Sequence, residues 1–361
     1  MTDPIIAPRD EIASMEGYYS PQIDVEVRLN SNEAPEPPPS AFISRLRGEI
    51  NEISLNRYPE REAEELRSAV AAHHGVYKEQ VYCANGSNEV LQSILLAYGG
   101  RDRSVAVFEP TYALHSHIAR VTGTQVVTGR RDEEFLVSLE EYDRVATLGA
   151  TQGLNFPALT FLCSPNNPTG RVEPLETVRA ILDRARGLVV VDEAYGQFAP
   201  RSAIDLLSKH RNLLIVRTFS KTWSLAALRL GYVVADPEII DALWRVTLPY
   251  HLDAIKQIAG VLAIEYEQEM NERIRLIVAE RKRLLGALAH LQVDVVPSDA
   301  NFILFRVIAK DAKRVWSALF EDSILIRDIS TVPYLSGYLR VTIGTPEEND
   351  RFLDALTRAL V

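Results

Sequence analysis

Short apolar runs recur through the middle of the 361-residue chain and alternate with stretches of helical periodicity. Runs of this kind, rich in β-branched residues, predict buried strands. Strands separated by helical stretches predict parallel pairing, with helices on both faces of the sheet. The predicted fold class is therefore α/β, with a large domain built on a mostly parallel sheet. The expected strands of this sheet span 81–84, 104–108, 125–127, 159–163, 188–191, 213–216 and 231–235.

The pattern changes after Pro249, which indicates a second, smaller α+β domain. One long amphipathic helix, continuous or broken, is expected over about 255–291, and short strands alternate with helices after it. At the other end of the chain, three consecutive prolines at 37–39 oppose a helix before about Ser40 and favour an extended arm that packs across another part of the protein. The expected organisation is an arm with part of the small domain over 1–51, a large domain over 52–250 and a small domain over 251–361.

Composition limits the class of partner. The formal net charge of -10 and the pI near 5.3 argue against nucleic acid and against an anionic membrane surface. No apolar segment approaches the length of a membrane span, and the first residues do not resemble a secretory signal. Cys83 and Cys163 each fall inside a strand-like run, so buried free thiols in a reducing cytosol are expected instead of a disulfide. A cytoplasmic protein is the prediction.

Lys221 follows the predicted strand 213–216 and so lies beyond its carboxyl end, the edge of an open α/β sheet where ligands bind. It stands next to Ser220 and eight residues before Arg229. A lysine amine that is partly desolvated and close to another cation loses its proton more readily and forms a Schiff base with an aldehyde. Ser220 and Arg229 would then bind a phosphate on the same aldehyde. The alternative for an isolated Ser-Lys pair is a surface lysine.

Three further segments at predicted strand ends carry polar side chains. Ser87 opens a predicted helix after Gly86, where backbone amides and the helix dipole bind phosphate, although a simple N-cap fits equally well. Asn167 lies in a loop with two prolines and a glycine, and its amide can donate to a ligand oxygen; a plain turn is the alternative. Asp192 follows a buried strand and precedes Tyr195 by three residues. An acid at this place can contact a ligand, bind a metal or cap a helix.

Two late arginines, Arg327 and Arg340, fall at strand-like positions, where a charge needs a partner or solvent. Guanidinium groups match carboxylate or phosphate with two parallel hydrogen bonds, and salt bridges to Asp328 or Glu347 are the alternative. The pair His115 and His117 is interpreted as two surface histidines, because no cluster of acids or cysteines supports a metal site. No metal site is predicted.

Taken together and in this order, these motifs resemble the fold-type I pyridoxal-phosphate aminotransferases and, among them, the histidinol-phosphate aminotransferase family. The resemblance runs from Tyr18 to about Thr345. One departure lies in the arm, where the third polar residue of the family's Asn-Glu-Asn-Pro or Asn-Glu-Ser-Pro motif is replaced by Ala34. The matching motifs are Arg57–Pro59, Asn85–Glu89, Ser164–Gly170, Asp192–Tyr195, Thr218–Arg229 and Pro297–Phe302, with Arg327 and Arg340.

The resemblance implies a role for each matching residue. Lys221 would join the cofactor aldehyde and then carry the proton between the substrate α-carbon and the cofactor, and Asp192 would keep the pyridine nitrogen protonated. Asn167 and Tyr195 would hold the ring hydroxyl, with Tyr112 stacked on the ring. Arg340 would bind the substrate carboxylate, and Arg327 with Tyr18 the substrate phosphate. The remaining cofactor residues, which would surround its phosphate, are Gly86, Ser87, Asn88, Thr218, Ser220, Arg229 and Tyr58 of the neighbouring subunit.

The activity implied is transamination between glutamate and imidazole-acetol phosphate, giving histidinol phosphate and 2-oxoglutarate in histidine biosynthesis. A ping-pong course follows, because the cofactor holds the amino group between two half-reactions. A homodimer with shared active sites is implied by the role of Tyr58. The alternatives on the same scaffold are an aromatic amino-acid aminotransferase and a phosphothreonine decarboxylase.

Overall fold

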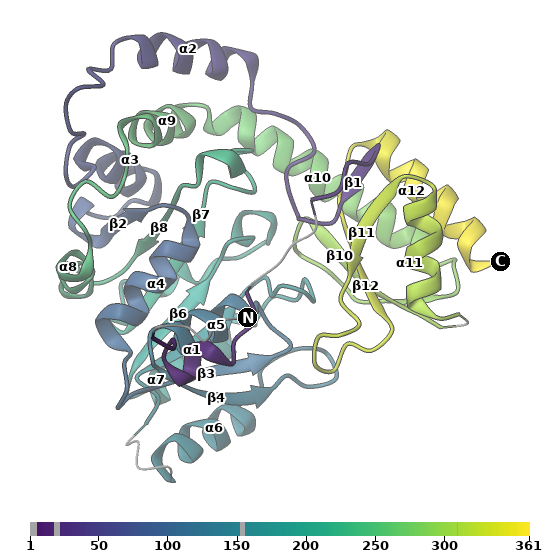
Figure 1. Ribbon diagram of the computed structural model, residues 1–361, viewed down its shortest axis with the longest axis horizontal. Helices are drawn as coiled ribbons and strands as arrows, with labels where there is room; N and C mark the ends of the chain where they lie inside the picture. The colour runs from purple at the N-terminus through teal and green to yellow at the C-terminus, as the bar shows by residue number, and fades with distance from the viewer. Residues whose placement is uncertain (1–5, 18–21, 152–155, 309) are drawn as a thin grey trace.

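The computed structural model describes residues 6–17, 22–151, 156–308 and 310–361. Its strands form two sheets, one of seven strands and one of five. Figure 1 shows the smaller sheet to the right of the larger one, with the carboxyl-terminal helices behind and beside it. In the described residues no helix combines the length and the apolar character that crossing a bilayer requires.

The large sheet has the strand order β2-β8-β7-β6-β5-β3-β4. Neighbouring strands from β7 to β4 are parallel, as the alternation of strands and helices predicts, whereas β8 runs antiparallel to both β7 and β2. No crossover helix separates β7 from β8, so the chain turns back on itself there. The strands are β2 Val81–Ala84, β3 Ser104–Glu109, β4 Gln125–Arg130, β5 Leu159–Cys163, β6 Leu188–Asp192, β7 Leu213–Thr218 and β8 Gly231–Val234.

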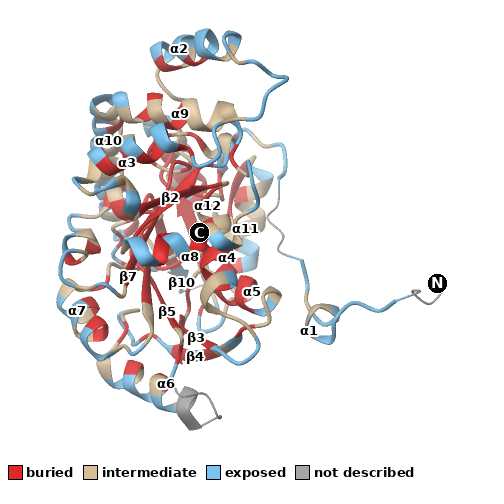
Figure 2. Ribbon diagram, turned by 90° about the vertical axis from the view of Figure 1, so that its left-hand side faces the viewer, coloured by how far each residue is buried: buried red, intermediate tan, exposed pale blue. Residues whose placement is uncertain are grey.

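Helices cover both faces of the large sheet, which confirms the α/β class. Helices α4, α5 and α8 pack on one face, and the other face is divided between α6 with α7 and α3 with α2 and α9. Figure 2 shows the strands buried between helices whose outer sides are exposed. The bounds are α2 Ser40–Asn51, α3 Glu64–His74, α4 Ser87–Tyr98, α5 Leu114–Val121, α6 Leu139–Thr151, α7 Leu175–Arg184, α8 Pro237–Val246 and α9 Ala254–Glu265.

The small sheet has the order β1-β11-β12-β10-β9, and its core is closed by α10, α11 and α12. Strand β1 comes from the amino-terminal arm and pairs in parallel with β11, so the arm does pack across a distant part of the protein. The short helix α1 precedes it. The bounds are α1 Asp10–Ala13, β1 Val27–Leu29, α10 Glu267–Leu288, β9 Val293–Val295, β10 Phe302–Val307, α11 Ala312–Glu321, β11 Ile324–Asp328, β12 Tyr338–Thr342 and α12 Pro346–Leu360.

The long helix expected after Pro249 is broken into α9 and α10 at Tyr266, whose ring packs edge-on against Phe42 of α2 with the centroids 5.8 Å apart. Helix α10 begins on the core of the large sheet with Met270 and ends on the core of the small sheet with Leu284 and Leu288. The two cores are thus joined by one helix. The domain limits at residues 51 and 250 stay a prediction.

Candidate active site

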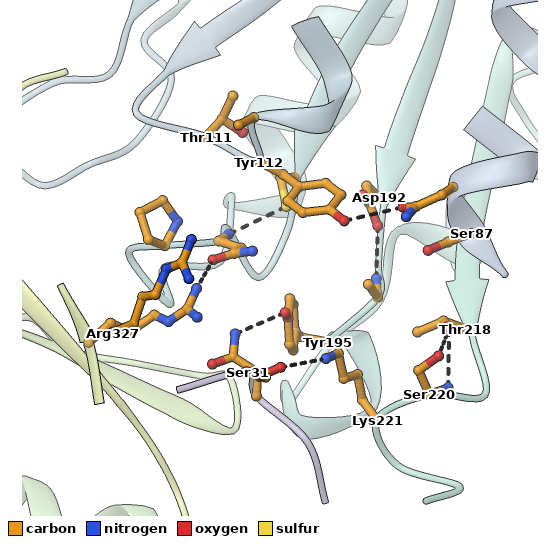
Figure 3. A pocket seen from close by; sticks show the side chains of 18 of the residues that line it. Ser31, Ser87, Thr111, Tyr112, Asp192, Tyr195, Thr218, Ser220, Lys221 and Arg327 are labelled. Carbon is orange, nitrogen blue, oxygen red and sulfur yellow. Dashed lines mark hydrogen bonds between the residues drawn. The ribbon is translucent and has the colours of Figure 1, made fainter. Parts of the chain in front are cut away.

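A cavity of about 790 Å3 opens at the carboxyl ends of β5, β6 and β7, which is the edge that the sequence predicts. The arm residues Asn30, Ser31, Asn32 and Glu33 form part of its wall, and β11 and β12 close it from the small sheet. Figure 3 shows side chains from both sheets and from the arm converging on this space.

Lys221 lies in the connection between β7 and β8 and lines the cavity. Its Nζ donates a hydrogen bond to the backbone oxygen of Ser31, 3.1 Å away, and lies 5.7 Å from the ring centroid of Tyr195. Burial, followed by the positive charges of Arg340 and Arg229, lowers the pKa of Lys221 to about 8. The amine is therefore much easier to deprotonate than an ordinary lysine, as a nucleophile must be.

An anion cradle lies beside Lys221, and we use this name for Gly86, Ser87, Thr218, Ser220 and Arg229. The Thr218 hydroxyl donates to Ser220 Oγ over 3.0 Å, and Arg229 Nη1 donates to the same oxygen over 3.3 Å. Ser87 is the first residue of α4, and Gly86 occupies the N-cap with a φ of 83°. Helix amides, hydroxyls and a guanidinium therefore face one small volume, which suits a phosphate.

Asp192 ends β6 and is almost fully buried, with 1% of its surface exposed. Its Oδ1 accepts a hydrogen bond from the backbone nitrogen of Ala194 over 3.0 Å, and its Oδ2 lies 3.0 Å from His115 Nε2. The His115 ring stacks on Phe161 and meets Tyr112 edge-on. A carboxylate held this firmly at the cavity wall is placed to bind a cationic ring nitrogen.

The expectation that His115 lies on the surface is wrong, because the residue is fully buried. Its position on α5 gave a usable signal: Ile118 and Ala119, three and four residues later, are also buried, so His115 shares the inward face of the helix. The local sequence does not show its acidic partner, because Asp192 lies 77 residues away along the chain.

Asn167 and Tyr195 face the cavity from the loops after β5 and β6. Asn167 Oδ1 accepts a hydrogen bond from Arg340 Nη1, and the Tyr195 hydroxyl lies 3.0 Å from Asn32 Nδ2. Burial raises the pKa of Tyr195 to about 12, so the phenol keeps its proton. Tyr112, from the start of the segment leading into α5, donates its hydroxyl proton to Asn88 Oδ1 over 3.2 Å, and Figure 3 shows its ring along one wall of the cavity.

Arg327 and Arg340 stand directly opposite each other on β11 and β12, and both line the cavity. Arg340 is 8% exposed, and its Nη2 donates to the backbone oxygen of Asn30 over 2.8 Å. Two cationic side chains at facing positions of a strand pair repel each other. Their shared position at the cavity wall therefore favours anionic ligands.

Most residues named from the sequence meet in this one cavity. Gly86 lies just behind it, where an added Cβ would come 2.9 Å from Arg229 Nη2. Tyr58 does not line the cavity; it is 79% exposed and stacks on Tyr250 with the ring centroids 4.4 Å apart. Tyr18 falls outside the described residues. The lining residues named in advance are Ser87, Asn88, Tyr112, Asn167, Asp192, Tyr195, Thr218, Ser220, Lys221, Arg229, Arg327 and Arg340.

Other expectations concern residues near the site. Cys83 and Cys163 are buried free thiols, as predicted. No group of three or more potential metal ligands occurs within the described ranges. Ala34, which replaces the third polar residue of the family's arm motif, does not line the main cavity. It lines a separate cavity of about 160 Å3.

Comparison with known proteins gives a consistent result. The family model for aminotransferase class I and II matches residues 25–356. A histidinol-phosphate aminotransferase of Corynebacterium diphtheriae is 43% identical, over 96% of this chain and 94% of that protein. One from Frankia casuarinae is 41% identical, over 98% of this chain and 90% of that protein.

A solved structure with the same fold is the histidinol-phosphate aminotransferase of Sinorhizobium meliloti in complex with pyridoxal 5'-phosphate. Its TM-score to this chain is 0.85 at 23% identity, and the match covers 97% of this chain and 96% of that one. At this identity the likeness shows the fold alone.

Proposed function

The chain belongs to the class I and II aminotransferase family, and we propose that it catalyses the reaction for which its curated relatives are named. It exchanges an amino group between glutamate and imidazole-acetol phosphate, giving histidinol phosphate and 2-oxoglutarate as a step of histidine biosynthesis. The cofactor is pyridoxal 5'-phosphate, and the reaction takes place in the cytoplasm.

The cavity offers a matching group for each polar part of pyridoxal phosphate. The anion cradle suits its phosphate, Lys221 its aldehyde, and Asp192 its ring nitrogen. The cradle is also tightly built, since an added Cβ at Gly231 would come 2.4 Å from the Ser87 nitrogen. These residues therefore fit the cofactor, and Asn167 with Tyr195 would hold its ring hydroxyl while Tyr112 packs on the ring face.

When bound, the cofactor supplies an aldehyde that takes up amino groups and a protonated ring that accepts electrons. Lys221 Nζ would hold the aldehyde in the resting enzyme and, as a free amine, would take the proton from the substrate α-carbon. Its lowered pKa keeps a usable share of the amine neutral at the start of this step. Asp192 would hold the proton of the ring nitrogen, and its contact with His115 fixes the direction of the side chain.

The observation that carries the substrate assignment is the facing pair of arginines on β11 and β12. Arg340 would bind the carboxylate of glutamate in one half-reaction, and Arg327 would bind the phosphate of histidinol phosphate in the other. One substrate presents a carboxylate and the other a phosphate, at different positions, so one cavity needs two cationic side chains to bind both.

We extend the proposal to a homodimer in which each subunit completes the other's site. Tyr58 and Tyr250 form an exposed aromatic pair, and Leu55 and Leu248 are 85% and 77% exposed. The two leucines stand within three residues of the stacked pair in the sequence, and exposed apolar side chains that gather in this way favour burial in an interface. His251, next to Tyr250, accepts a hydrogen bond from Asn85 at the start of the cradle turn, so this surface adjoins the anion cradle.

The substrate assignment is tested with single half-reactions. Purified holoenzyme is mixed with histidinol phosphate or with phenylalanine, and the loss of the lysine-bound cofactor absorbance is followed. Histidinol phosphate should react faster at equal concentration. A faster response to phenylalanine would show an aromatic amino-acid aminotransferase, and release of carbon dioxide from phosphothreonine would show a decarboxylase.

A further inference from the structure

Asn32 lies three residues after β1 and is enclosed by elements that are far apart in the sequence. It is 1% exposed and has a φ of 54°, a left-handed conformation that asparagine tolerates better than most residues. Its backbone oxygen accepts a hydrogen bond from Asn301 Nδ2 over 3.1 Å. Its side-chain Nδ2 lies 3.0 Å from the Tyr195 hydroxyl. The residue is thus fixed at both its backbone and its amide.

The orientation of the Asn32 amide follows from Thr342. The Thr342 hydroxyl oxygen accepts a hydrogen bond from the Asn32 backbone nitrogen over 2.9 Å, and its single proton is donated to Asn32 Oδ1 over 3.2 Å. If the amide were turned over, its NH2 group would face the Thr342 hydroxyl. The Thr342 proton would then lose Asn32 Oδ1 as its acceptor. Oδ1 therefore faces Thr342, and Nδ2 faces Tyr195.

An amide nitrogen only donates hydrogen bonds, so the Tyr195 oxygen accepts from Asn32 and must direct its own proton elsewhere. Tyr195 lines the cavity, and its hydroxyl keeps its proton because burial raises the pKa of the phenol. We infer that Asn32 is a positioning residue that makes Tyr195 a hydrogen-bond donor toward the cavity. This inference rests on the proposed function, because the acceptor is the ring oxygen of the cofactor.

Asn167 supports the same polarity from the other side. Its Oδ1 accepts a hydrogen bond from Arg340 Nη1. The Nδ2 group, which only donates, is then the part of the amide that can contact a ligand in the cavity. Two donors then meet at one ligand oxygen. Such a site stabilises a deprotonated oxygen over a hydroxyl, because both groups direct protons at that oxygen.

The consequence is measurable in the colour of the holoenzyme. A donor on the ring oxygen withdraws negative charge from it and so lowers the pH at which the lysine-bound chromophore loses its proton. In Asn32→Asp the carboxylate accepts from Tyr195, which turns the Tyr195 proton away from the cavity. In Asn32→Gly the left-handed backbone is retained and only the amide is lost.

The test is a spectrophotometric pH titration of the bound cofactor in wild-type protein, in both Asn32 variants and in each of them combined with Tyr195→Phe. We expect Asn32→Asp to raise the pKa of the chromophore in both backgrounds. The rise should be about one unit larger in the protein that keeps Tyr195 than in the Tyr195→Phe protein. The difference isolates the effect carried by Tyr195, because the charge of the new carboxylate acts in both backgrounds. Asn32→Gly should give a smaller shift in the same direction, and Thr342→Ser, which keeps the hydroxyl, should give none.

Equal shifts in the two backgrounds, or no shift in either Asn32 variant, would overturn the inference. Retained binding of the cofactor by the Asn32→Gly protein, seen in its absorbance, shows that the fold has survived the change. A wild-type protein that acquires no cofactor absorbance would instead refute the proposed function, so the two failures are told apart.

Discussion

Lys221 shares its cavity with Arg340 and Arg229, and the positive charges of both arginines lower its pKa. These charges and burial act in the same direction, and Glu33 at the cavity wall opposes them only partly. An acidic protein, with a formal net charge of -10, thus holds several basic side chains together where anions must bind. The same arrangement activates the lysine and attracts the phosphate and carboxylate groups of the ligands.

The lowered pKa of Lys221 gives a pH dependence with a defined sign. Below the pKa of about 8 the amine is mostly protonated, so the rate of covalent attachment of pyridoxal phosphate to cofactor-free protein should rise about tenfold per pH unit and level off above pH 8. The rate is followed by absorbance after mixing, with a blocked lysine in solution as the control. A rate that keeps rising toward the ordinary lysine pKa of 10.5 would contradict this environment.

Arg327 should discriminate between the two substrates. Arg327→Ala removes a charged contact worth about 1.5–3 kcal/mol, so the KM for histidinol phosphate should rise about ten- to a hundredfold, while that for glutamate changes less than about threefold. Steady-state kinetics with each substrate measure this. Arg306→Ala is the matched control: Arg306 lies in the same sheet but pairs with exposed Asp294, and neither KM should change. Equal losses for both substrates in Arg327→Ala would make that residue structural.

The sequence predicted the site residues that stand in contiguous motifs at strand ends, such as Lys221 and Asp192. The sequence did not predict the contacts of Asn32 with Tyr195 or of His115 with Asp192, because the partners in each pair are more than 70 residues apart. Their roles depend on which side of α5 or of the arm faces inward, and that is decided by tertiary packing. The surface interpretation of His115 failed for this reason.

At the scale of elements, the reversal of β8 is what places the lysine. A crossover helix after β7 would carry the chain away from the sheet edge, whereas the antiparallel return keeps residues 219–230 beside the ends of β6 and β7. The start of α4 then packs against the first residue of β8, because Gly231 has no side chain to keep the Ser87 nitrogen away. The anion cradle is the product of this contact.

Gly231→Ala should therefore damage the cradle. Its Cβ would come 2.4 Å from the Ser87 nitrogen, so α4 must move, at a cost of about 1–3 kcal/mol in the free energy of unfolding. The Kd for pyridoxal phosphate should rise as well. Gly286→Ala is the control, because that glycine is exposed in α10 with open space around it, and alanine there should stabilise by up to about 1 kcal/mol. Denaturant unfolding and cofactor titration report both, and an unchanged Kd for Gly231→Ala would contradict the cradle.

Element positions were largely predictable, because burial on both faces gives the strands of the large sheet continuous apolar runs. Two features were not. Strand direction leaves no trace in such runs, so the sequence predicted a mostly parallel sheet without showing that β8 is the strand that runs antiparallel. The helix break at Tyr266 depends on the packing of its ring against α2, which the amphipathic pattern does not encode.

At the scale of the whole molecule, the cavity exists because two sheets and the arm meet. Strand β1 of the arm pairs with β11. The residues that follow β1 place Ser31 in contact with Lys221 and Asn32 in contact with Tyr195. The exposed aromatic pair of Tyr58 and Tyr250 lies on the outside, near the cradle turn. A second subunit would cover it and bring its own Tyr58 to this chain's cradle.

The shared site can be tested by complementation. In a two-fold dimer, co-expressed Tyr58→Ala and Lys221→Ala chains form mixed dimers that contain one intact site, so the pooled protein should show about a quarter of wild-type activity. Sedimentation should give twice the 40.4 kDa of the chain. If Tyr58 served its own subunit, the mixed dimers would contain no intact site, and the pooled activity would not exceed that of the Tyr58→Ala chains alone.

The most direct test of the central claim is the chemical identity of the lysine that holds the cofactor. Purified protein is incubated with pyridoxal phosphate, reduced with borohydride, digested and analysed by mass spectrometry. A single pyridoxyl phosphate group on Lys221, absent when Lys221→Ala is treated in the same way, is the result expected. Labelling of a different lysine, or of none, would contradict the account.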